Sequence, residues 1–171
     1  MANVTVPAAL LEALIERSLQ LEVLAYEDKL TRLFNRTRLE MDLEDAESAQ
    51  YAFGYGYIIL DVDGLKEAND RLGHHAGDML LRSVAEIIRA ETDRSGDGAY
   101  RLGGDEFVVL VKNCCPRGIA AIIERIQALL EDKGLSASAG GGHSSEEGFM
   151  ELADQRMYAD KVKRKGAANI R

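Results

Sequence analysis

The sequence predicts an α/β fold in which a mainly antiparallel central sheet is flanked by helices, and three observations support that prediction. Residues 57–60 form a continuous apolar run that ends in acids, which is typical of a buried central strand. Two further apolar runs, at residues 99–102 and 107–111, enclose Gly103 and Gly104, and a glycine pair there favours a hairpin tip. The rest of the chain is mostly helical in pattern, so the predicted order is strand, two helices, hairpin, helix, strand, helix.

Length and composition suit one domain with room for a short appendage. The chain has 171 residues, of which 46% are hydrophobic and 29% are charged, an ordinary mixture for a globular protein. The net charge of −8 argues against nucleic acid as a partner, because nucleic-acid binding leaves a basic footprint. A polyanionic substrate would therefore have to meet a local positive patch and a metal ion.

Nothing in the sequence predicts a membrane segment or a secretory signal, and we expect a cytoplasmic protein. No apolar run approaches the ~18 residues of a membrane span, and the N-terminus lacks a basic region followed by an apolar core. The neighbouring Cys114 and Cys115 are a poor framework for a disulfide or a zinc site, so we expect free thiols.

Residues 7–25 are predicted to form an N-terminal helix. Its apolar stripe consists of Leu10, Leu11, Leu14, Ile15, Leu21 and Leu24. Part of the stripe fits the a/d seam of a coiled coil, although two to three heptads are short for such a structure. Two interpretations stay open, a dimerising helix and a helix packed on its own domain.

The remaining elements follow from local patterns. Residues 28–36 are expected to be a helix end and a turn, in which Asp28 and Thr31 satisfy exposed backbone groups. Further helices are predicted at residues 38–50, 77–91, 117–131 and 147–165. Residues 135–142 are expected to form a strand despite a Ser-Ala-Ser-Ala-Gly-Gly-Gly run of weak β-propensity, and residues 167–171 to add a terminal strand.

Acidic residues stand at the end of the central strand and after the hairpin tip. Asp61 and Asp63 end the strand, and Asp105 and Glu106 follow the glycine pair. For the hairpin alone, a solvated turn is the simpler explanation. If the strand pairs beside the hairpin, Asp61 comes near Asp105, and two buried carboxylates without a cation would be costly. Carboxylates with a backbone carbonyl are hard oxygen ligands, which suit Mg²⁺ or Mn²⁺.

A series of short motifs adds specificity to this acidic pair. In chain order they are Asp28-Lys-Leu-Thr-Arg-Leu-Phe-Asn-Arg36, Asp61-Val-Asp-Gly-Leu-Lys66, Asn69-Asp70, Gly73-His-His-Ala-Gly-Asp78, Arg101-Leu-Gly-Gly-Asp-Glu-Phe107, and Ala153-Asp154 through Tyr158 and Lys161. Over residues 26–171 the chain resembles the catalytic domain of GGDEF-family diguanylate cyclases, which make cyclic di-GMP from two GTP. The resemblance implies a palm-like fold, similar to ferredoxin-like domains and class III nucleotide cyclases.

The resemblance also implies a metal centre and a phosphate site. Asp61, the carbonyl of Val62 and Asp105 would hold Mg²⁺ or Mn²⁺, and Glu106 would contact a second metal or orient the attacking hydroxyl. Phosphates would be bound by residues at a helix N-terminus and near the chain's end, namely Gly64, Leu65, Lys66, Lys161 and Lys165. Each assignment has a simpler alternative. From spacing alone, Lys66 is expected to be an exposed lysine on a helix, and the basic run at residues 161–165 is expected to stabilise a helix C-terminus through its positive charge.

Guanine recognition and product feedback are implied in the same way. Asn69 and Asp78 would hold guanine, whose edge offers hydrogen-bond donors to a carboxylate and acceptors to an amide. The alternative interpretation is that both residues are helix caps. Arg94 and Asp97 match the family's product-inhibition site, with Arg125 as a supporting residue. Without the resemblance, the local sequence of Arg94 and Asp97 predicts only a solvated loop.

The implied function is a diguanylate cyclase that works as a homodimer, with residues 1–25 as a signalling or dimerisation helix and residues 26–171 as the catalytic domain. An upstream sensor domain is an expected partner. The main alternative is a weak or inactive domain that binds GTP or cyclic di-GMP as a signalling module. It is motivated by departures from the family pattern, Asp160 before Lys161 and Lys165 in place of arginine. A third hypothesis is an interaction domain that dimerises through the N-terminal helix.

Overall fold

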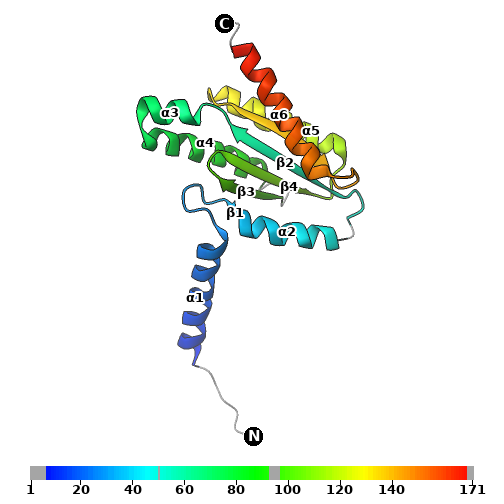
Figure 1. Ribbon diagram of the computed structural model, residues 1–171. Coiled ribbons are helices and arrows are strands. Elements are labelled where there is room, and N and C mark those ends of the chain that lie inside the picture. The colour runs from blue at the N-terminus through cyan, green and yellow to red at the C-terminus, as the bar shows by residue number, and fades with distance from the viewer. Residues whose placement is uncertain (1–6, 50, 93–96, 169–171) are drawn as a thin grey trace.

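A five-stranded mixed sheet lies between two layers of helices in the computed structural model of the chain, which describes residues 7–49, 51–92 and 97–168 (Figure 1). The strands are β1 (Phe34–Asn35), β2 (Tyr55–Val62), β3 (Gly98–Gly103), β4 (Glu106–Lys112) and β5 (Ala137–His143). The helices are α1 (Ala8–Tyr26), α2 (Arg36–Ser48), α3 (Leu65–Leu72), α4 (His74–Thr92), α5 (Pro116–Asp132) and α6 (Phe149–Ala168).

The sheet has the order β1-β3-β4-β2-β5. The short strand β1 runs parallel to β3, and the other three neighbouring pairs are antiparallel. The predicted α/β fold with a mainly antiparallel sheet and an N-terminal helix is therefore confirmed. The predicted terminal strand is wrong as far as Ala168, because α6 continues to that residue, and residues 169–171 lie outside the described part of the chain.

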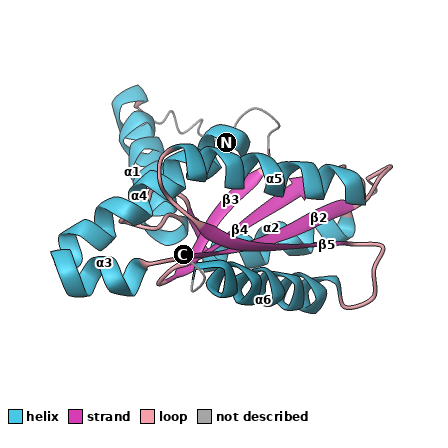
Figure 2. Ribbon diagram, turned by 90° about the horizontal axis from the view of Figure 1, so that it is seen from above, coloured by secondary structure: helices cyan, strands magenta, loops and turns pink. Residues whose placement is uncertain are grey.

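The helices cover both faces of the sheet, because alternate side chains of the central strand point to opposite sides. Ile58 and Leu60 pack with α4 and α5 in one buried cluster, whereas Tyr57 and Ile59 belong to a second cluster with α2 and α6. Figure 2 shows the two helix layers with the sheet between them. Since β2 is buried along its whole length, its acidic end is held rigidly.

Strand β5 is fully buried although its sequence has weak β-propensity. It pairs with β2 from Val62↔Ala137 to Gly56↔His143. A Cβ atom on Gly140 would lie 2.1 Å from the carbonyl oxygen of Ala153, and one on Gly142 would lie 1.9 Å from that of Phe149. The glycines that weaken the strand are thus the residues that allow α6 to lie directly on it.

Helix α1 projects away from the rest of the molecule (Figure 1). None of the described residues of this helix is buried, and the large apolar side chains of its stripe are 50–61% exposed. The interpretation of this helix as one packed along its own domain is therefore not what the structure shows. Within the described residues, no helix combines the length and the hydropathy that a membrane crossing requires.

Candidate functional site

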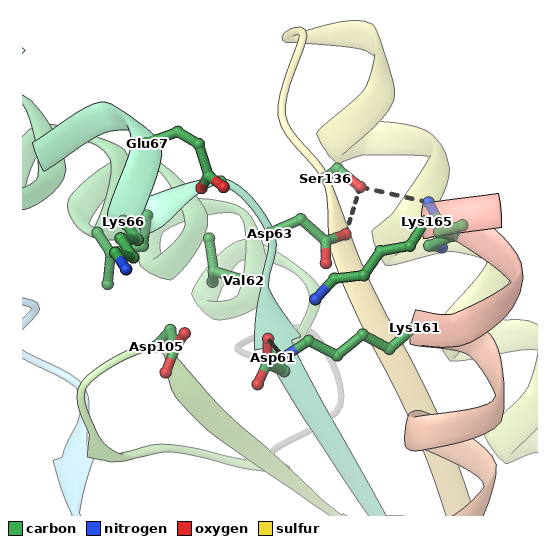
Figure 3. Close-up of a pocket in the computed structure, with 12 residues that line it drawn as sticks. Asp61, Val62, Asp63, Lys66, Glu67, Asp105, Ser136, Lys161 and Lys165 are labelled. Atoms are coloured by element: carbon green, nitrogen blue, oxygen red, sulfur yellow. Dashed lines mark hydrogen bonds and ion pairs between the residues drawn. The ribbon is translucent and has the colours of Figure 1, made fainter. Parts of the chain in front are cut away.

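A cavity of about 450 Å³ lies at the carboxyl end of β2, where the β3–β4 turn, the start of α3 and the end of α6 meet (Figure 3). Its lining consists of Asp61, Val62, Asp63, Gly64, Leu65, Lys66, Glu67, Asp105, Ser136, Lys161, Arg164 and Lys165. The cavity therefore brings together most of the residues predicted for the metal and the phosphates. It also contains four residues that the sequence did not single out for this site, Asp63, Glu67, Ser136 and Arg164.

Asp105 lies in the β3–β4 turn, and two contacts hold this turn in position. Gly103 and Gly104 have φ angles of 143° and 55°, which a residue with a side chain rarely adopts, so the glycine pair permits the turn. The main-chain N–H of Val62 donates to the carbonyl of Asp105 at 3.0 Å. Arg101 donates to the carbonyl of Gly104 at 2.7 Å through Nη2, so the turn is tied both to β2 and to a side chain.

Arg101 also connects the turn to the segment that follows α1. Its Nη1 lies 3.0 Å from Oδ1 of Asp28, and its side chain is only 11% exposed. The same oxygen of Asp28 accepts from the N–H of Thr31 at 2.8 Å, a backbone group as predicted, and also from the Thr31 hydroxyl at 2.7 Å. The contact with Arg101 was not predicted, because the two residues are 73 positions apart.

Asp61 and Glu106 are register partners on β2 and β4. Register partners place their side chains on the same face, so Glu106 lies beside Asp61 rather than across the sheet from it. Asp61 accepts a hydrogen bond from Nζ of Lys161 at 2.7 Å. This bond raises the pKa of Lys161, and the charges of Asp61, Asp105 and Asp63 act in the same direction. The ammonium of Lys161 is therefore positioned among the acids of the cavity.

Asp63 holds the loop between β2 and α3 against β5. Its carboxylate accepts from the hydroxyls of Ser136 at 2.7 Å and Ser138 at 3.1 Å, and its N–H donates to the carbonyl of Ser136 at 3.0 Å. Gly64, with a φ of 78°, is the N-cap of α3, and the next residues, Leu65 and Lys66, line the cavity. The start of α3 is thus fixed in place beside the acids.

Asn69 and Asp78 lie farther along the two helices that follow β2. A Cβ atom on Gly77 would lie 2.2 Å from Oδ1 of Asn69, so the Asn69 side chain rests against α4 at Gly77, the residue that precedes Asp78 in the chain. Neither residue is an N-cap, because Gly64 precedes α3 and Asp78 is inside α4. The interpretation of both residues as helix caps is therefore wrong. Both residues lie outside the cavity lining.

Asp160, the acid that departs from the family pattern, is directed toward β5. It accepts from the N–H of Ala139 at 3.1 Å, from the amide of Gln127 at 2.9 Å and from Nε of Arg164 at 3.0 Å. Lys161 and Lys165, one helical turn apart, face the cavity instead (Figure 3). Asp160 thus anchors α6 to the edge strand and does not line the cavity.

The residues predicted for product feedback are described only in part. Arg94 lies outside the described residues. Asp97 accepts from the main-chain N–H of Lys112 at 2.8 Å, which ties the start of β3 to β4. Arg125 on α5 forms an ion pair with Glu91, whose side chain is 4% exposed.

The donor set at the end of β2 fits a small divalent cation. Across the described ranges, no group of three or more His, Cys, Asp or Glu side chains is placed to hold a metal ion. Mg²⁺ does not need such a group, because it is usually held by one or two carboxylates together with water and substrate phosphates. Asp61, Asp105 and Val62, the last residue of β2, line the same cavity. Carboxylate and carbonyl oxygens are the ligands that Mg²⁺ and Mn²⁺ prefer.

Fold and cavity together define a palm-like α/β domain with an acidic strand end facing a lysine-bearing helix. A family model described as "Diguanylate cyclase, GGDEF domain" matches residues 25–167, so the chain belongs to the GGDEF domain family.

Among curated proteins, MucR of Pseudomonas aeruginosa, a bifunctional diguanylate cyclase/cyclic di-GMP phosphodiesterase, is 36% identical over 166 residues, which cover 88% of this chain and 24% of that protein. The diguanylate cyclase DgcS of Shewanella oneidensis is 37% identical over 148 residues, which cover 79% of this chain and 49% of that protein. The chain thus spans about a quarter to a half of these relatives.

Solved structures show the same fold. The coiled coil and GGDEF domain of DgcB from Caulobacter crescentus, in complex with c-di-GMP, matches with a TM-score of 0.79 and 27% identity, and the match covers 91% of this chain and 90% of that one.

Proposed function

We propose that this chain is a diguanylate cyclase, which condenses two GTP molecules into cyclic di-GMP with release of two pyrophosphates. One observation carries the proposal: Asp61 and Asp105 line the same cavity as Lys66, Lys161 and Lys165. Acids at a rigid strand end suit a metal, and lysines from two helices suit a triphosphate. Membership of the GGDEF family and the names of the curated relatives support the same reaction.

The proposed roles follow from the positions of the residues. Gly64, Leu65 and Lys66 would bind phosphate at the N-terminus of α3, and Lys161 and Lys165 would bind the β- and γ-phosphates from α6. When bound to Asp61, Val62 and Asp105, Mg²⁺ or Mn²⁺ would neutralise charge at the α-phosphate and lower the pKa of the attacking 3′-hydroxyl.

Two further roles concern orientation. Glu106 stands beside Asp61 on the neighbouring strand and would orient the attacking hydroxyl or contact a second metal ion. Asn69 and Asp78 would read the guanine base, with the carboxylate accepting from N1–H and the 2-amino group and the amide donating to an acceptor. The contact of Asn69 with α4 at Gly77, the chain neighbour of Asp78, supports this pairing.

The reaction requires two copies of the domain. One cavity would hold one GTP, and the 3′-hydroxyl of each nucleotide would attack the α-phosphate of the other across a two-fold axis. We assign dimerisation to residues 1–25, because the apolar stripe of α1 is exposed and unsupported by its own domain. Residues 26–171 would form the catalytic domain, and a sensor domain upstream would control it. A cytoplasmic site of action suits the free thiols of Cys114 and Cys115.

Product feedback is the last part of the proposal. Arg94 and Asp97 would bind cyclic di-GMP, with Arg125 in support, because a guanidinium fork suits phosphate and the guanine edge. Replacing Arg94 by alanine should relieve inhibition by added cyclic di-GMP while the initial rate is kept. Unchanged inhibition would reject this site.

The test is incubation of the concentrated protein with GTP and Mg²⁺, read by mass for cyclic di-GMP and pyrophosphate. We expect product from the natural sequence and none from Asp61→Asn, whose fold is checked by circular dichroism. No product from the natural sequence would contradict the proposal.

A second function is favoured by the contact between Lys161 and Asp61, which places a lysine on a proposed metal ligand, and by Lys165 in place of arginine. In this function the domain binds GTP or cyclic di-GMP as a signal without turnover. Tight nucleotide binding that Asp105→Asn leaves unchanged, together with absence of product, would support it.

A further inference from the structure

Lys161 is a lysine of the last helix whose ammonium lies against the acidic end of β2. Nζ donates to Oδ1 of Asp61 at 2.7 Å, and the two side chains are 26% and 12% exposed. Figure 3 shows the long side chain reaching from α6 to Asp61, with Asp105 beyond it in this view. Lys161 therefore neutralises a carboxylate that the proposed function assigns to a metal ion.

The other cations of α6 near the cavity have different neighbours. Arg164 pairs with Asp160 at 3.0 Å and with Glu131 at 3.4 Å, and both of these acids are outside the proposed metal ligands. Lys165 follows Lys161 by one turn and extends into the cavity. Lys161 is thus distinguished by its direct contact with Asp61.

This contact has consequences for metal binding. A carboxylate that is only 12% exposed needs a cation nearby, because a buried charge without a partner is costly. A divalent ion on the same carboxylate would be repelled by an ammonium only a few ångströms away. The ammonium can leave Asp61 at low cost only if another anion receives it, and a triphosphate in the same cavity is such an anion.

We propose that Lys161 is an exchangeable counter-cation, which neutralises Asp61 in the ligand-free site and transfers to the triphosphate when metal and nucleotide bind together. This inference rests on the function proposed above. The flexible four-carbon stem and three donors of a lysine allow the change of partner without movement of α6. Metal alone has to compete with the ammonium, whereas metal with triphosphate does not, so the two ligands bind with positive coupling.

The test measures two affinities that should move in opposite directions in Lys161→Met. Binding of Mn²⁺ alone, followed by the electron paramagnetic resonance signal of free Mn²⁺, should become tighter by about fivefold, because the competing charge is gone. Binding of α,β-methylene GTP with Mg²⁺ should become weaker by about tenfold, because a charge-assisted hydrogen bond to phosphate is lost. An ion pair without transfer would change the Mn²⁺ affinity alone, so unchanged binding of the GTP analogue by Lys161→Met would overturn the inference.

Three variants make the result specific. Lys163→Met removes the same charge about 200° round the same helix and should leave both affinities unchanged. Lys161→Arg keeps the charge and should keep the weak binding of Mn²⁺ alone. In the double variant Asp61→Asn/Lys161→Met, the gain in Mn²⁺ affinity should disappear, because its ligand is gone.

Equal or weaker Mn²⁺ binding by Lys161→Met would overturn the inference, and so would a gain that persists in the double variant. Should Lys161→Met fail to fold, Lys161→Gln supplies a second charge-free side chain for the same measurement. Neither readout requires turnover. Absence of cyclic di-GMP would therefore contradict the proposed function without altering the outcome of these titrations.

Discussion

Helices α1 and α6 stand at opposite ends of the chain and have nearly equal lengths, 19 and 20 residues, but only α6 packs on the sheet. Ala153 of α6 is fully buried, and Phe149 at its start makes an edge-to-face contact with Tyr55 at a centroid distance of 5.5 Å. The leucines of α1 are instead at least half exposed.

The difference lies in the surface that each helix meets. Strand β5 offers α6 a face of glycines, on which helix backbone and strand backbone come close together. Asp160 and Arg156 then bind main-chain groups of the same strand, Ala139 and Gly141. Helix α1 has an apolar stripe without such a face. An amphipathic pattern thus indicates that a helix has an apolar side but does not say what covers it.

The largest expected effect breaks the packing of α6. In Gly142→Val, the new Cβ would lie 1.9 Å from the carbonyl oxygen of Phe149, so α6 has to move off the strand. We expect the free energy of unfolding to fall by about 3 kcal/mol or more, measured by urea denaturation. Gly166→Ala on α6 is the matched control, since nothing lies within 4 Å of its Cβ position. Equal stability of the two variants would show that β5 does not position α6.

The next effect concerns how each helix reaches the acids of the cavity. Helix α6 contacts Asp61 directly through Lys161, whereas α1 is followed by Asp28, which reaches the turn through Arg101. In Arg101→Met the turn carbonyl and Asp28 both lose a charged donor. We expect a loss of about 2 kcal/mol in unfolding free energy and a fall in turnover larger than the rise in KM. The rate is measured as cyclic di-GMP formation.

The control for that prediction is Arg32→Met, which removes an arginine that is 62% exposed in its ion pair with Glu27. A surface pair of this kind contributes little, so both stability and rate should stay near those of the natural sequence. If Arg101→Met behaved like this control, the turn would be held without Arg101.

A smaller effect is expected from the acid that anchors α6 to the edge strand. Asp160→Ala leaves the N–H of Ala139 without its carboxylate, and we expect a loss of about 1–2 kcal/mol in unfolding free energy. Because Asp160 points toward β5, affinity for a GTP analogue should change little. Gln155→Ala, an exposed change on the same helix, is the control. Markedly tighter nucleotide binding by Asp160→Ala would mean that this acid repels the triphosphate.

The smallest effect on domain stability is expected for α1. Replacing Leu14 and Leu21 together by serine should change the unfolding free energy of the domain by less than about 0.5 kcal/mol, because neither side chain is buried. Self-association, measured by sedimentation, should be lost if the stripe forms the dimer seam. A large loss of domain stability at concentrations where the protein is monomeric would contradict the difference between the two helices.

The sequence by itself determined most of the elements and the acidic residues beside the β2 end and the hairpin tip, but it did not predict β1, and its terminal strand is wrong as far as Ala168. A continuous apolar run specified β2, a glycine pair specified the β3–β4 turn, and helical spacing specified α4 and α5. These are local signals, because the residues that carry each of them are close together in the sequence. The neighbours of β2 did not follow from these signals, because the pairing of this strand with the hairpin was left as a condition. The structure supplies both antiparallel partners, β4 and β5.

Only the tertiary structure decided which distant charges meet. Asp61 and Lys161 are 100 positions apart, and Asp28 and Arg101 are 73 apart, so no local pattern pairs them. The same holds for the glycines of β5, whose weak β-propensity has meaning only once α6 lies on them. Local periodicity reports which side of an element is apolar, whereas the contact between two elements depends on the shape and charge of both.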